Sequence, residues 1–442
     1  MARRGLLGES IATAALAGLL FGFDTAVVAG VTADWRHVFQ LDDAALGLTV
    51  SAAIWGTLVG ALCTGLPGDR YGARNVLRVL ALFYIASAVV AALSWGLGSL
   101  VVARLVTGLA IGGSSVLAPV YIAEISPAAR RGQMVGLFQL MVVTGILVAF
   151  LSNAAVGAFA DPATAWRWKL GVPALPALLF LGLLYRIPDS PRWLIARGRE
   201  AEARASLELI GVPNPQGELA TFREAVRAEN KQRGAHLSWT QHRKPILLAV
   251  ALAAFNQLAG INAILYYSND IFAAAGYGRL SSDLQTIAIG ATNLVFTMIG
   301  LALIDRIGRK TLLLVGAVGM AVCLAVVASI FWGILPKPLL LLILVGYIAF
   351  FAPSQGAVIW VYLSEIFPTR VRARGMGIGS STHWLMNAII AGIFPVIAHR
   401  STGAPFLFFA VMMALQFVVV FIFFPETKGV TLEKMDARME SA

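Results

Sequence analysis

Charged side chains are scarce in this chain of 442 residues. Asp, Glu, Lys and Arg together make up 13% of it, whereas 58% of the residues are apolar. Soluble domains contain roughly 25% charged residues. The deficit excludes a soluble cytosolic enzyme, a secreted protein and an intrinsically disordered chain, because none of these has a composition so apolar. It predicts instead a protein embedded in a lipid bilayer.

Cysteines and nucleotide-binding motifs are also scarce or missing. The two cysteines, Cys63 and Cys323, each lie inside an apolar run, so neither a disulfide framework nor a cysteine metal site is expected. No Walker A sequence, dinucleotide fingerprint, nucleophile–base set or metal cluster interrupts the apolar runs. We therefore expect no cofactor, no bound metal, no enzyme activity and no self-contained ATP-driven pump.

Long apolar runs are what the chain has in abundance. A membrane-spanning helix needs about 20 mainly apolar residues. Twelve such stretches occur, at approximately 9–31, 45–68, 76–97, 99–124, 133–157, 167–187, 245–275, 283–304, 311–333, 338–365, 375–398 and 404–425. The first run is interpreted as an uncleaved span rather than a signal peptide, because eleven further spans follow it.

Basic residues are distributed unevenly between the loops. Of the 34 Lys and Arg residues, 27 lie on the termini and on one alternate set of loops, six lie on the other set, and Arg104 lies within a span. Cytoplasmic loops are enriched in Lys and Arg. We therefore predict that both termini and the long central segment face the cytoplasm. The net charge of +11 then reflects membrane topology and contact with anionic lipid rather than a nucleic-acid partner.

Two sequence motifs occur twice, in the same order. Asp69-Arg70-x-Gly72-x-Arg74 follows the second span and Asp305-Arg306-x-Gly308-Arg309 follows the eighth. Tyr121-x-x-Glu124-x-x-Pro127-x-x-x-Arg131 closes the fourth span and Tyr362-x-x-Glu365-x-x-Pro368-x-x-x-Arg372 closes the tenth. Such repetition implies a duplicated six-helix unit with the substrate path between the halves.

This repetition predicts the organisation of the chain. An N-terminal six-helix half (1–187) is followed by a cytoplasmic linker (188–243), a C-terminal six-helix half (244–425) and a cytoplasmic tail (426–442). Within the linker, the Ala-, Glu- and Arg-rich segments 196–210 and 217–231 are predicted to form short surface helices, separated by Pro213 and Pro215.

Further motifs occur in a fixed order along nearly the whole chain. They are Gly22-Phe23-Asp24, Arg104, Pro119-x-Tyr121-x-x-Glu124, Pro188-Asp189-Ser190-Pro191-Arg192, Gln257-Leu258-Ala259-Gly260-Ile261-Asn262 with Tyr266-Tyr267, Trp360, and Pro425-Glu426-Thr427-Lys428-Gly429. With the repeated motifs, they resemble the sugar porter family of the major facilitator superfamily. The resemblance implies twelve helices, alternating access and transport of monosaccharides. The bacterial members most similar in pattern are proton-coupled pentose and hexose symporters.

Asp24 and Arg104 are the charges that lie deepest in apolar surroundings. A charge at mid-bilayer costs roughly 2.5–3.5 kcal/mol on insertion scales, so each needs a partner or a function. We expect them to face each other. Burial raises the proton affinity of a carboxylate and a nearby guanidinium lowers it, so a moving Arg104 would couple transport to protonation of Asp24. Proton-coupled relatives resemble this chain in having Asp here. The alternative is a permanent pair that only fixes helix packing.

Buried amides are the other conspicuous polar groups. A sugar site needs amides that both donate and accept hydrogen bonds, and an aromatic plate for the sugar ring. Trp360 matches the family's aromatic position, and the positions that match family sugar ligands are Gln139, Gln257, Asn262, Asn293 and Asn387. Any one of these amides alone would equally suit a helix–helix hydrogen bond.

The chain departs from the family pattern at three positions in this region. Asn256 replaces the first Gln of a usual pair and is kept as a predicted ligand. His383 stands where relatives often have an amide, on the same helix face as Asn387. A sugar ligand, a packing hydrogen bond and a role in proton coupling all stay open for His383. Ala352 stands where several passive facilitators carry an acidic residue.

Two spans are predicted to contain irregular backbone. Gln257 and Asn262 lie five positions apart, which is about 140° around a regular helix. Both can face one cavity only if the helix is distorted between them, and Gly260 is suited to that. Pro353 and Gly356 predict the same for the tenth span. Irregular backbone at membrane depth is tolerated where it lines a cavity.

Charged residues of the repeated motifs are predicted to form a cytoplasmic gate. Ion pairs between the halves would close the inner side and then break, and several weak pairs suit such a switch. The predicted members are Arg70, Arg74, Glu124, Arg131, Arg192, Arg306, Arg309, Glu365 and Arg372. The alternative is that the arginines are plain positive-inside charges.

The sequence thus predicts an all-α integral membrane protein with twelve transmembrane helices in two six-helix pseudo-repeats and a short intracellular helical segment. The predicted function is import of a monosaccharide, either a hexose or xylose, in symport with protons across a bacterial inner membrane. Passive uniport is one alternative, and a non-transporting sugar sensor is a remote one. The expected partners are the sugar, the proton and the bilayer, with the chain active as a monomer.

Overall fold

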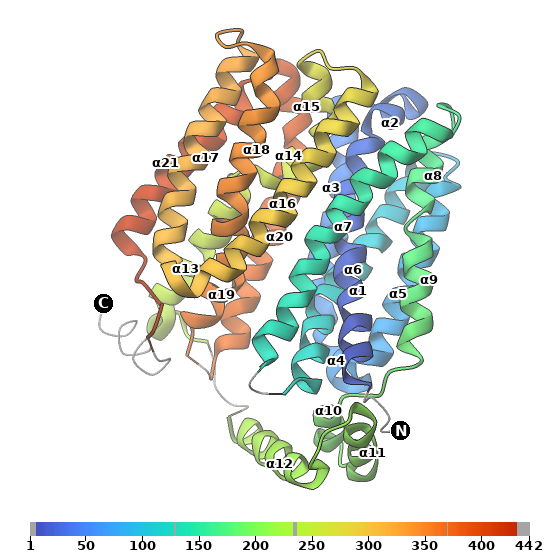
Figure 1. The fold of residues 1–442 in the computed structure, drawn as a ribbon, viewed down its shortest axis with the longest axis vertical. Coiled ribbons are helices and arrows are strands. Elements are labelled where there is room, and N and C mark those ends of the chain that lie inside the picture. The colour runs from blue at the N-terminus through green and yellow to red at the C-terminus, as the bar shows by residue number, and fades with distance from the viewer. Residues whose placement is uncertain (1–5, 128–129, 233–236, 369, 431–442) are drawn as a thin grey trace. The chain divides into compact units, whose positions relative to one another are not determined.

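The structure, a computed structural model, describes residues 6–127, 130–232, 237–368 and 370–430 (Figure 1). Twelve helical segments of this described part are long and apolar enough to cross a membrane, which confirms the twelve predicted spans. The predicted tail is described as far as residue 430. Residues 431–442, and Arg3 and Arg4 at the N-terminus, lie outside the described residues.

The spans are built from α1 (Leu7–Val27), α3 (Asp43–Cys63), α5 (Ala73–Ala92), α6 (Leu97–Ile125), α7 (Arg131–Phe159), α8 (Ala165–Gly171) with α9 (Ala174–Leu184), α13 (Trp239–Leu258) with α14 (Ile261–Tyr266), α16 (Arg279–Ile307), α17 (Arg309–Phe331), α18 (Leu340–Phe351) with α19 (Ala357–Glu365), α20 (Arg372–Arg400) and α21 (Ala404–Phe423). The shorter helices are α2 (Thr32–Phe39), α4 (Gly65–Tyr71), α10 (Pro191–Ala196), α11 (Glu200–Ile210), α12 (Pro215–Gln232) and α15 (Ser268–Ala274).

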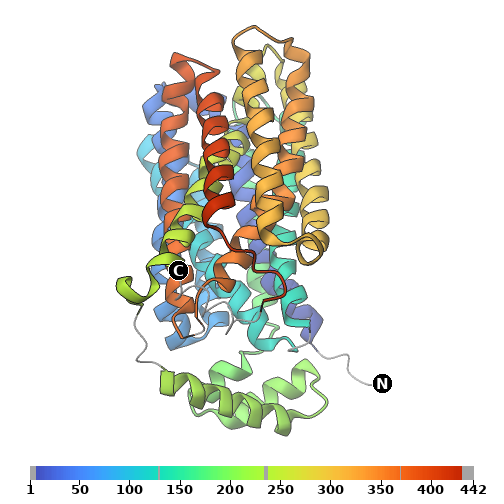
Figure 2. The same ribbon diagram turned by 90° about the vertical axis from the view of Figure 1, so that its left-hand side faces the viewer.

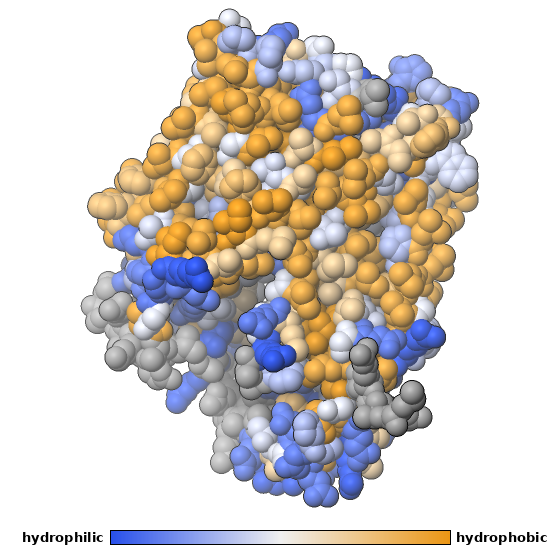
Figure 3. Space-filling view, viewed as in Figure 1, coloured by the Kyte–Doolittle hydropathy of each residue, from blue (hydrophilic) through white to orange (hydrophobic). Residues whose placement is uncertain are grey.

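Helix is the expected form for these runs, because the bilayer offers no water to hydrogen-bond an open backbone. The outer faces of the spans are apolar as well. Figure 3 shows hydrophobic side chains over α16 and α17 and hydrophilic ones over α11 and α12. Leu342 of α18 and Phe421 of α21 are 66% and 61% exposed. Surfaces of this kind suit contact with lipid tails and not with water.

The chain forms two compact units. Unit 1 consists of Met1–Asp24, Trp55–Ile146 and Arg167–Ala235, and unit 2 of Thr25–Ile54, Leu147–Trp166 and His236–Ala442. The boundaries fall inside α1, α3, α7 and α8, so unit 2 includes segments from both predicted halves of the sequence. The predicted organisation into halves at 187 and 244 stays a prediction.

Each unit has its own apolar core. In unit 1, α5 packs against α6 and α9, and Leu77, Tyr121 and Phe180 are fully buried there. In unit 2, α17 runs beside α21, as Figure 2 shows, and α13 packs along α20. Tyr362 and Phe367 are fully buried in that core.

The linker helices differ in detail from the prediction. The segment 196–210 is not one helix, because α10 ends at Ala196 and α11 begins only at Glu200. Gly198 between them has φ +74°, a left-handed conformation that glycine adopts readily. Pro215 is not a separator but the first residue of α12, where a missing N–H costs nothing. α12 ends at Gln232, close to the predicted end at 231.

The irregular backbone expected in two spans is confirmed. Gly260 has φ +81° between α13 and α14, and a Cβ atom there would lie 2.3 Å from the ring of Phe409. In the tenth span, residues Ala352–Gly356 form a π-helical turn between α18 and α19. A further break, unexpected from the sequence, lies at Tyr267 between α14 and α15.

Candidate functional site

The two deeply buried charges of unit 1 meet. Arg104 Nη1 of α6 lies 2.6 Å from Asp24 Oδ1 of α1, with side chains 4% and 11% exposed. The Arg104 Nε–H is buried and has no hydrogen-bond partner among the described residues. The attraction between the two side chains is therefore the main interaction that offsets the cost of burying either charge. Neutralising Asp24 would leave the Arg104 charge buried without this attraction.

Small residues bring α1 close to α7 next to this pair. A Cβ atom on Gly22 would lie 1.8 Å from the carbonyl oxygen of Val142, and one on Gly145 would lie 2.2 Å from that of Leu19. Such close backbone approach is typical of membrane helices that pack through small residues. The glycine two positions before Asp24 therefore helps to seat the carboxylate inside unit 1 rather than toward lipid.

Three of the predicted sugar-ligand amides lie together in unit 2. Asn262 Nδ2 donates to Gln257 Oε1 at 2.9 Å, and Gln257 Nε2 donates to Asn256 Oδ1 at 3.2 Å. On a regular helix Asn262 would point away from Gln257. The left-handed turn at Gly260 turns the chain back, so the two amides face each other.

His383 and Trp360 lie beside this group. Gln257 Nε2 is 3.1 Å from Nε2 and 3.2 Å from Nδ1 of the His383 ring. The rings of Trp360 and His383 are 5.2 Å apart and tilted by 54°. A polar edge next to an aromatic face is the arrangement that a sugar ring requires. The hydrogen bond to Gln257 also fits the packing interpretation of His383, so its role stays a prediction.

The other predicted amides retain unused hydrogen-bonding capacity. Asn387 Nδ2 donates to the Tyr266 hydroxyl at 3.2 Å, while its buried Oδ1 has no partner in the described structure. Asn293 is 6% exposed and Gln139 of unit 1 is half-buried, and neither side chain makes a hydrogen bond within the described ranges. Polar groups of this kind in an apolar span are costly unless a ligand or water meets them.

Sequence reasoning missed several polar residues of unit 2. Tyr266 was noted in a motif but not assigned to the site. Gln355 and Gln416 are fully buried and lie 2.6 Å apart, Nε2 to Oε1. Both were visible in the sequence as amides inside apolar spans, but neither coincides with a recognised motif.

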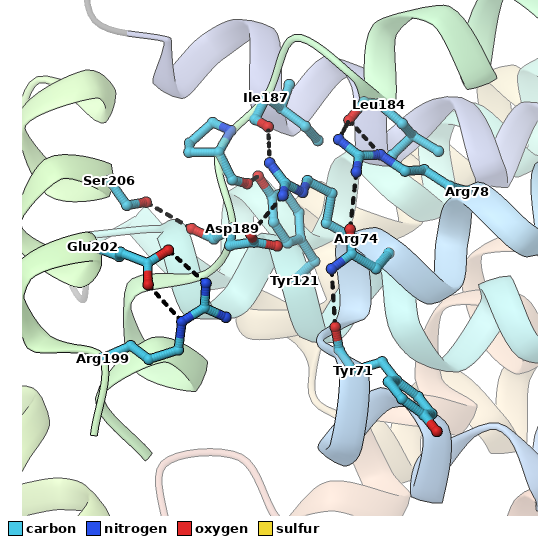
Figure 4. Close-up of polar contacts among 12 residues, drawn as sticks. Tyr71, Arg74, Arg78, Tyr121, Leu184, Ile187, Asp189, Arg199, Glu202 and Ser206 are labelled. Atoms are coloured by element: carbon cyan, nitrogen blue, oxygen red, sulfur yellow. Dashed lines mark hydrogen bonds and ion pairs between the residues drawn. The ribbon is translucent and has the colours of Figure 1, made fainter. Parts of the chain in front are cut away.

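The first copy of the repeated motifs forms a polar cluster in unit 1 (Figure 4). The Tyr121 hydroxyl donates to the Pro188 carbonyl at 2.7 Å. Arg74 donates to the Ile187 carbonyl at 2.8 Å and pairs with Asp189 Oδ2 at 2.5 Å. The motif thereby ties the ends of α5 and α6 to the segment that leads into α10. Asp189 was absent from the predicted gate.

The second copy repeats the tyrosine contact in unit 2 but forms a different ion pair. The Tyr362 hydroxyl donates to the Pro425 carbonyl at 3.0 Å, as Tyr121 does to Pro188. Arg309 makes a bidentate pair with Glu365, at 2.8 and 3.1 Å. The Glu426 carboxylate, also missed, accepts the backbone N–H groups of Arg309 and Lys310 at 2.9 and 3.0 Å and so caps α17.

The remaining predicted gate residues differ in their exposure. Arg70 and Arg306 are exposed, and Arg70 lies over the ring of Tyr71 at 5.3 Å. The Arg372 Nε–H is 3.4 Å from the Phe367 carbonyl. Glu124, Arg131 and Arg192 are half-buried. The ion pairs measured above, Arg74–Asp189 and Arg309–Glu365, each join residues of a single unit, and the gate itself stays a prediction.

A second polar cluster in unit 2 has no counterpart in the sequence prediction. Arg279, at the end of α16 away from Arg306, pairs with Asp34 of α2 at 2.8 Å. Asp43 pairs with Arg36 at 2.5 Å and lies 3.0 Å from His399 Nδ1. Isolated charges in loops gave no signal that these residues meet.

Asp270 of α15 belongs to the same region. Burial raises the pKa of this carboxyl to about 6, while the Thr32 hydroxyl and the Arg36 charge lower it. In the part of the chain described, the buried Oδ2 atom of Asp270 has no hydrogen-bond partner of ordinary geometry. Burial is therefore the largest influence on the pKa of this carboxyl.

Comparisons with known proteins agree with this architecture. The family model described as "Sugar (and other) transporter" matches residues 10–439. The arabinose-proton symporter of Bacillus subtilis is 35% identical over 96% of this chain and 93% of its own length. The glucose facilitated diffusion protein of Zymomonas mobilis is 36% identical, covering 99% of this chain and 98% of its own.

A solved structure extends the likeness to three dimensions. The inward-open structure of the xylose transporter XylE from E. coli matches with a TM-score of 0.88 and 31% identity, over 98% of this chain and 99% of that one. These relatives are sugar transporters and not enzymes. With twelve spans, the chain is a multi-pass membrane protein. It belongs to the sugar porter family of the major facilitator superfamily.

Proposed function

We propose that the protein imports a monosaccharide together with protons by alternating access. The buried Asp24–Arg104 pair supports the coupling of sugar transport to protons. The Asp24 carboxyl can bind and release a proton, and Arg104 is the close partner that compensates its charge. The sugar is a hexose such as glucose or galactose, or the pentose xylose. The relatives described as proton symporters support the same conclusion.

Protonation of Asp24 is the proposed coupling step. A charged Asp24 holds Arg104 at 2.6 Å, and proton binding removes that attraction. Arg104 then needs a different partner, and we expect the contact between α1 and α6 to change. If the proton binds in one conformation and leaves in the other, the proton gradient across the membrane drives the conformational cycle in one direction.

Sugar recognition is assigned to the amides of unit 2. Hydroxyl groups would bond to the open positions on Asn262, Asn293 and Asn387, and the ring face would lie on Trp360. Asn256, Gln257 and His383 support or join this set. Gln139 of unit 1 is assigned to the sugar on the resemblance alone.

The repeated motifs are proposed to form the cytoplasmic gate. The distribution of basic residues supports an orientation in which both termini and the linker face the cytoplasm. The ion pairs of Arg74 and Arg309 would then hold each motif copy in shape while weaker contacts open and close. The proposed location is a bacterial inner membrane, and the proposed functional form is a monomer.

Passive uniport is the second candidate. The facilitated diffusion protein at 36% identity favours it, since facilitation needs no coupled ion. Asp24 argues against it, because a facilitator gains nothing from a buried carboxylate that must be paired.

Transport by the purified protein in liposomes tests both candidates. Counterflow of labelled glucose is measured against a panel of unlabelled sugars, and exchange with at least one monosaccharide is expected. A pH gradient, acidic outside, is then imposed. Symport predicts accumulation above equilibrium that an uncoupler abolishes, whereas uniport predicts equilibration only. Absence of exchange with every sugar of the panel would overturn the transport proposal.

A further inference from the structure

Five amide side chains of unit 2 form one continuous series of hydrogen bonds, here called the amide chain. Each NH₂ group donates to the oxygen of the next member, over distances of 2.9, 3.2, 3.4 and 2.6 Å in order. The members are Asn262, Gln257, Asn256, Gln355 and Gln416. All of these bonds therefore run in the same direction, from the sugar-ligand positions toward α21.

The far end of the chain is the unexplained part. Gln416 lies within the apolar helix α21 and is completely buried. Its hydrogen bond to Gln355 is the one bond that its side chain makes within the described residues, and its Nε2 atom has no partner there. An amide in an apolar span is costly to bury, and a hydrogen bond between membrane helices adds little stability on average. A contribution to the stability of the fold therefore does not explain the presence of Gln at position 416.

Gln355 is held in an unusual backbone. It lies in the π-helical turn Ala352–Gly356, and turns of this kind occur frequently at functional sites. Its carbonyl oxygen accepts from Asn256 Nδ2 at 3.2 Å, in addition to the side-chain bond at 3.4 Å. Gln355 thus accepts from Asn256 Nδ2 through two oxygens, and the Asn256 oxygen is directed toward Gln257.

Each amide has a donor side and an acceptor side, so the orientation of one member dictates that of the next. Gln416 offers its oxygen, which forces Gln355 to direct Nε2 toward it and Oε1 toward Asn256. Asn256 then offers Oδ1 to Gln257, whose Nε2 is committed to Asn256 and His383. Gln257 Oε1 already accepts from Asn262 Nδ2, so its second lone pair and the outer atoms of Asn262 are left for a ligand.

We infer that Gln355 and Gln416 are a positioning pair that sets the donor–acceptor pattern of the sugar site. Through it they set the selectivity between sugars that differ at one hydroxyl. Without the acceptor on Gln416, Gln355 can rotate and exchange its oxygen and nitrogen. Its Nε2 then opposes Asn256 Nδ2, which the Gln355 backbone carbonyl keeps in place, and the repulsion between these two donors displaces Asn256 from Gln257. This inference rests on the proposed function, because it assumes that the amides at the near end bind sugar.

Matched variants at position 416 test the inference. Gln416→Met keeps the size of the side chain and removes the acceptor, whereas Gln416→Glu keeps an acceptor oxygen toward Gln355. Apparent affinities for two sugars differing at one hydroxyl are measured by counterflow, and by ligand-dependent thermal stabilisation in detergent, which needs no turnover. Gln416→Met should change the affinity ratio of the two sugars by roughly tenfold, the scale of one mispaired hydrogen bond. Gln416→Glu should retain the wild-type ratio.

Two further variants separate positioning from general structural damage. Gln355→Met breaks the same bond from the other side and should change the ratio in the same direction. Asn153→Leu removes a buried amide of unit 2 that bonds elsewhere, to the Val27 carbonyl at 3.1 Å, and should lower thermal stability without changing the ratio.

The possible outcomes are distinct. If wild-type protein transports sugar and both Met variants keep its selectivity ratio, the inference is wrong while the proposed function stands. If Asn153→Leu shifts the ratio as much as Gln416→Met does, the amide chain has no special role. If wild-type protein neither transports nor binds any sugar, the proposed function itself fails.

Discussion

Replacing Asp24 by Asn removes one charge from the buried pair and leaves its shape nearly intact. In the native structure Arg104 Nη1 lies 2.6 Å from Asp24 Oδ1, and the Arg104 Nε–H already lacks a partner among the described residues. The variant therefore leaves a buried guanidinium with a neutral amide oxygen in place of a carboxylate. It also fixes position 24 in a form that cannot exchange a proton.

The expected magnitudes follow from this geometry. Removing one partner of a buried ion pair costs about 3–5 kcal/mol. The Asn oxygen can keep a hydrogen bond to the charged donor, which retains about 1.5–3 kcal/mol. A net loss of about 1–3 kcal/mol is expected, so the variant should fold. For transport, one pH unit corresponds to about 1.4 kcal/mol, which would support roughly tenfold accumulation for one proton per sugar.

Liposomes with an imposed gradient of one pH unit provide the assay. Wild-type protein should accumulate sugar up to the roughly tenfold limit, whereas Asp24→Asn should only equilibrate it. Counterflow, which needs no net proton movement, should persist in the variant. Asp24→Glu retains a titratable carboxyl group and should keep part of the accumulation. Accumulation by Asp24→Asn at the wild-type level would refute coupling through Asp24 and favour the permanent-pair interpretation.

Three further perturbations test other parts of the structure by thermal unfolding in detergent. Gly260→Ala places a side chain at φ +81° and 2.3 Å from an aromatic ring, and should destabilise by about 2–5 kcal/mol. Gly377→Ala, with nothing within 4 Å of the new Cβ atom, is its control, and equal unfolding temperatures would contradict the prediction. Arg309→Lys should destabilise nearly as much as Arg309→Ala, because Lys cannot make the bidentate pair with Glu365; a wild-type unfolding temperature for the Lys variant would count against it. Burial raises the pKa of Asp270 to about 6, so the folded state binds this proton more tightly than the unfolded state does. The protonated Asp270 carboxyl therefore contributes to the free energy of unfolding below about pH 4, and this contribution is lost as the pH rises through about 6. The stability difference between wild type and Asp270→Asn should change over that window, and a constant difference would contradict this.

Much of the fold follows from local features of the sequence. Each apolar run of about 20 residues must form a helix in a bilayer, because its backbone has no other hydrogen-bond partners. The distortion at Gly260 was predictable for a similar local reason, since a five-residue spacing cannot place two amides on one helix face. Linker boundaries were less accurate, because the break at Gly198 depends on a glycine conformation that composition alone does not specify.

The candidate site was only partly predictable. Single amides inside apolar spans are conspicuous in the sequence, and Gln257 and Asn262 do meet. Gln355 and Gln416 carried the same signal, but no rule of spacing connects residues 61 positions apart. The gate prediction named Arg74 and Glu365 yet missed Asp189, which lies 115 positions from Arg74.

The sequence by itself determined the number of spans, the breaks at Gly260 and in the tenth span, and the inventory of buried polar groups, because these depend on hydrophobicity and backbone geometry over a few residues. The tertiary structure decided which polar groups meet. Arg279 and Asp34 lie 245 positions apart, and Gln257 and His383 lie 126 apart. Such pairs depend on how helices pack, and in an apolar environment each buried polar group requires a partner that only that packing can supply.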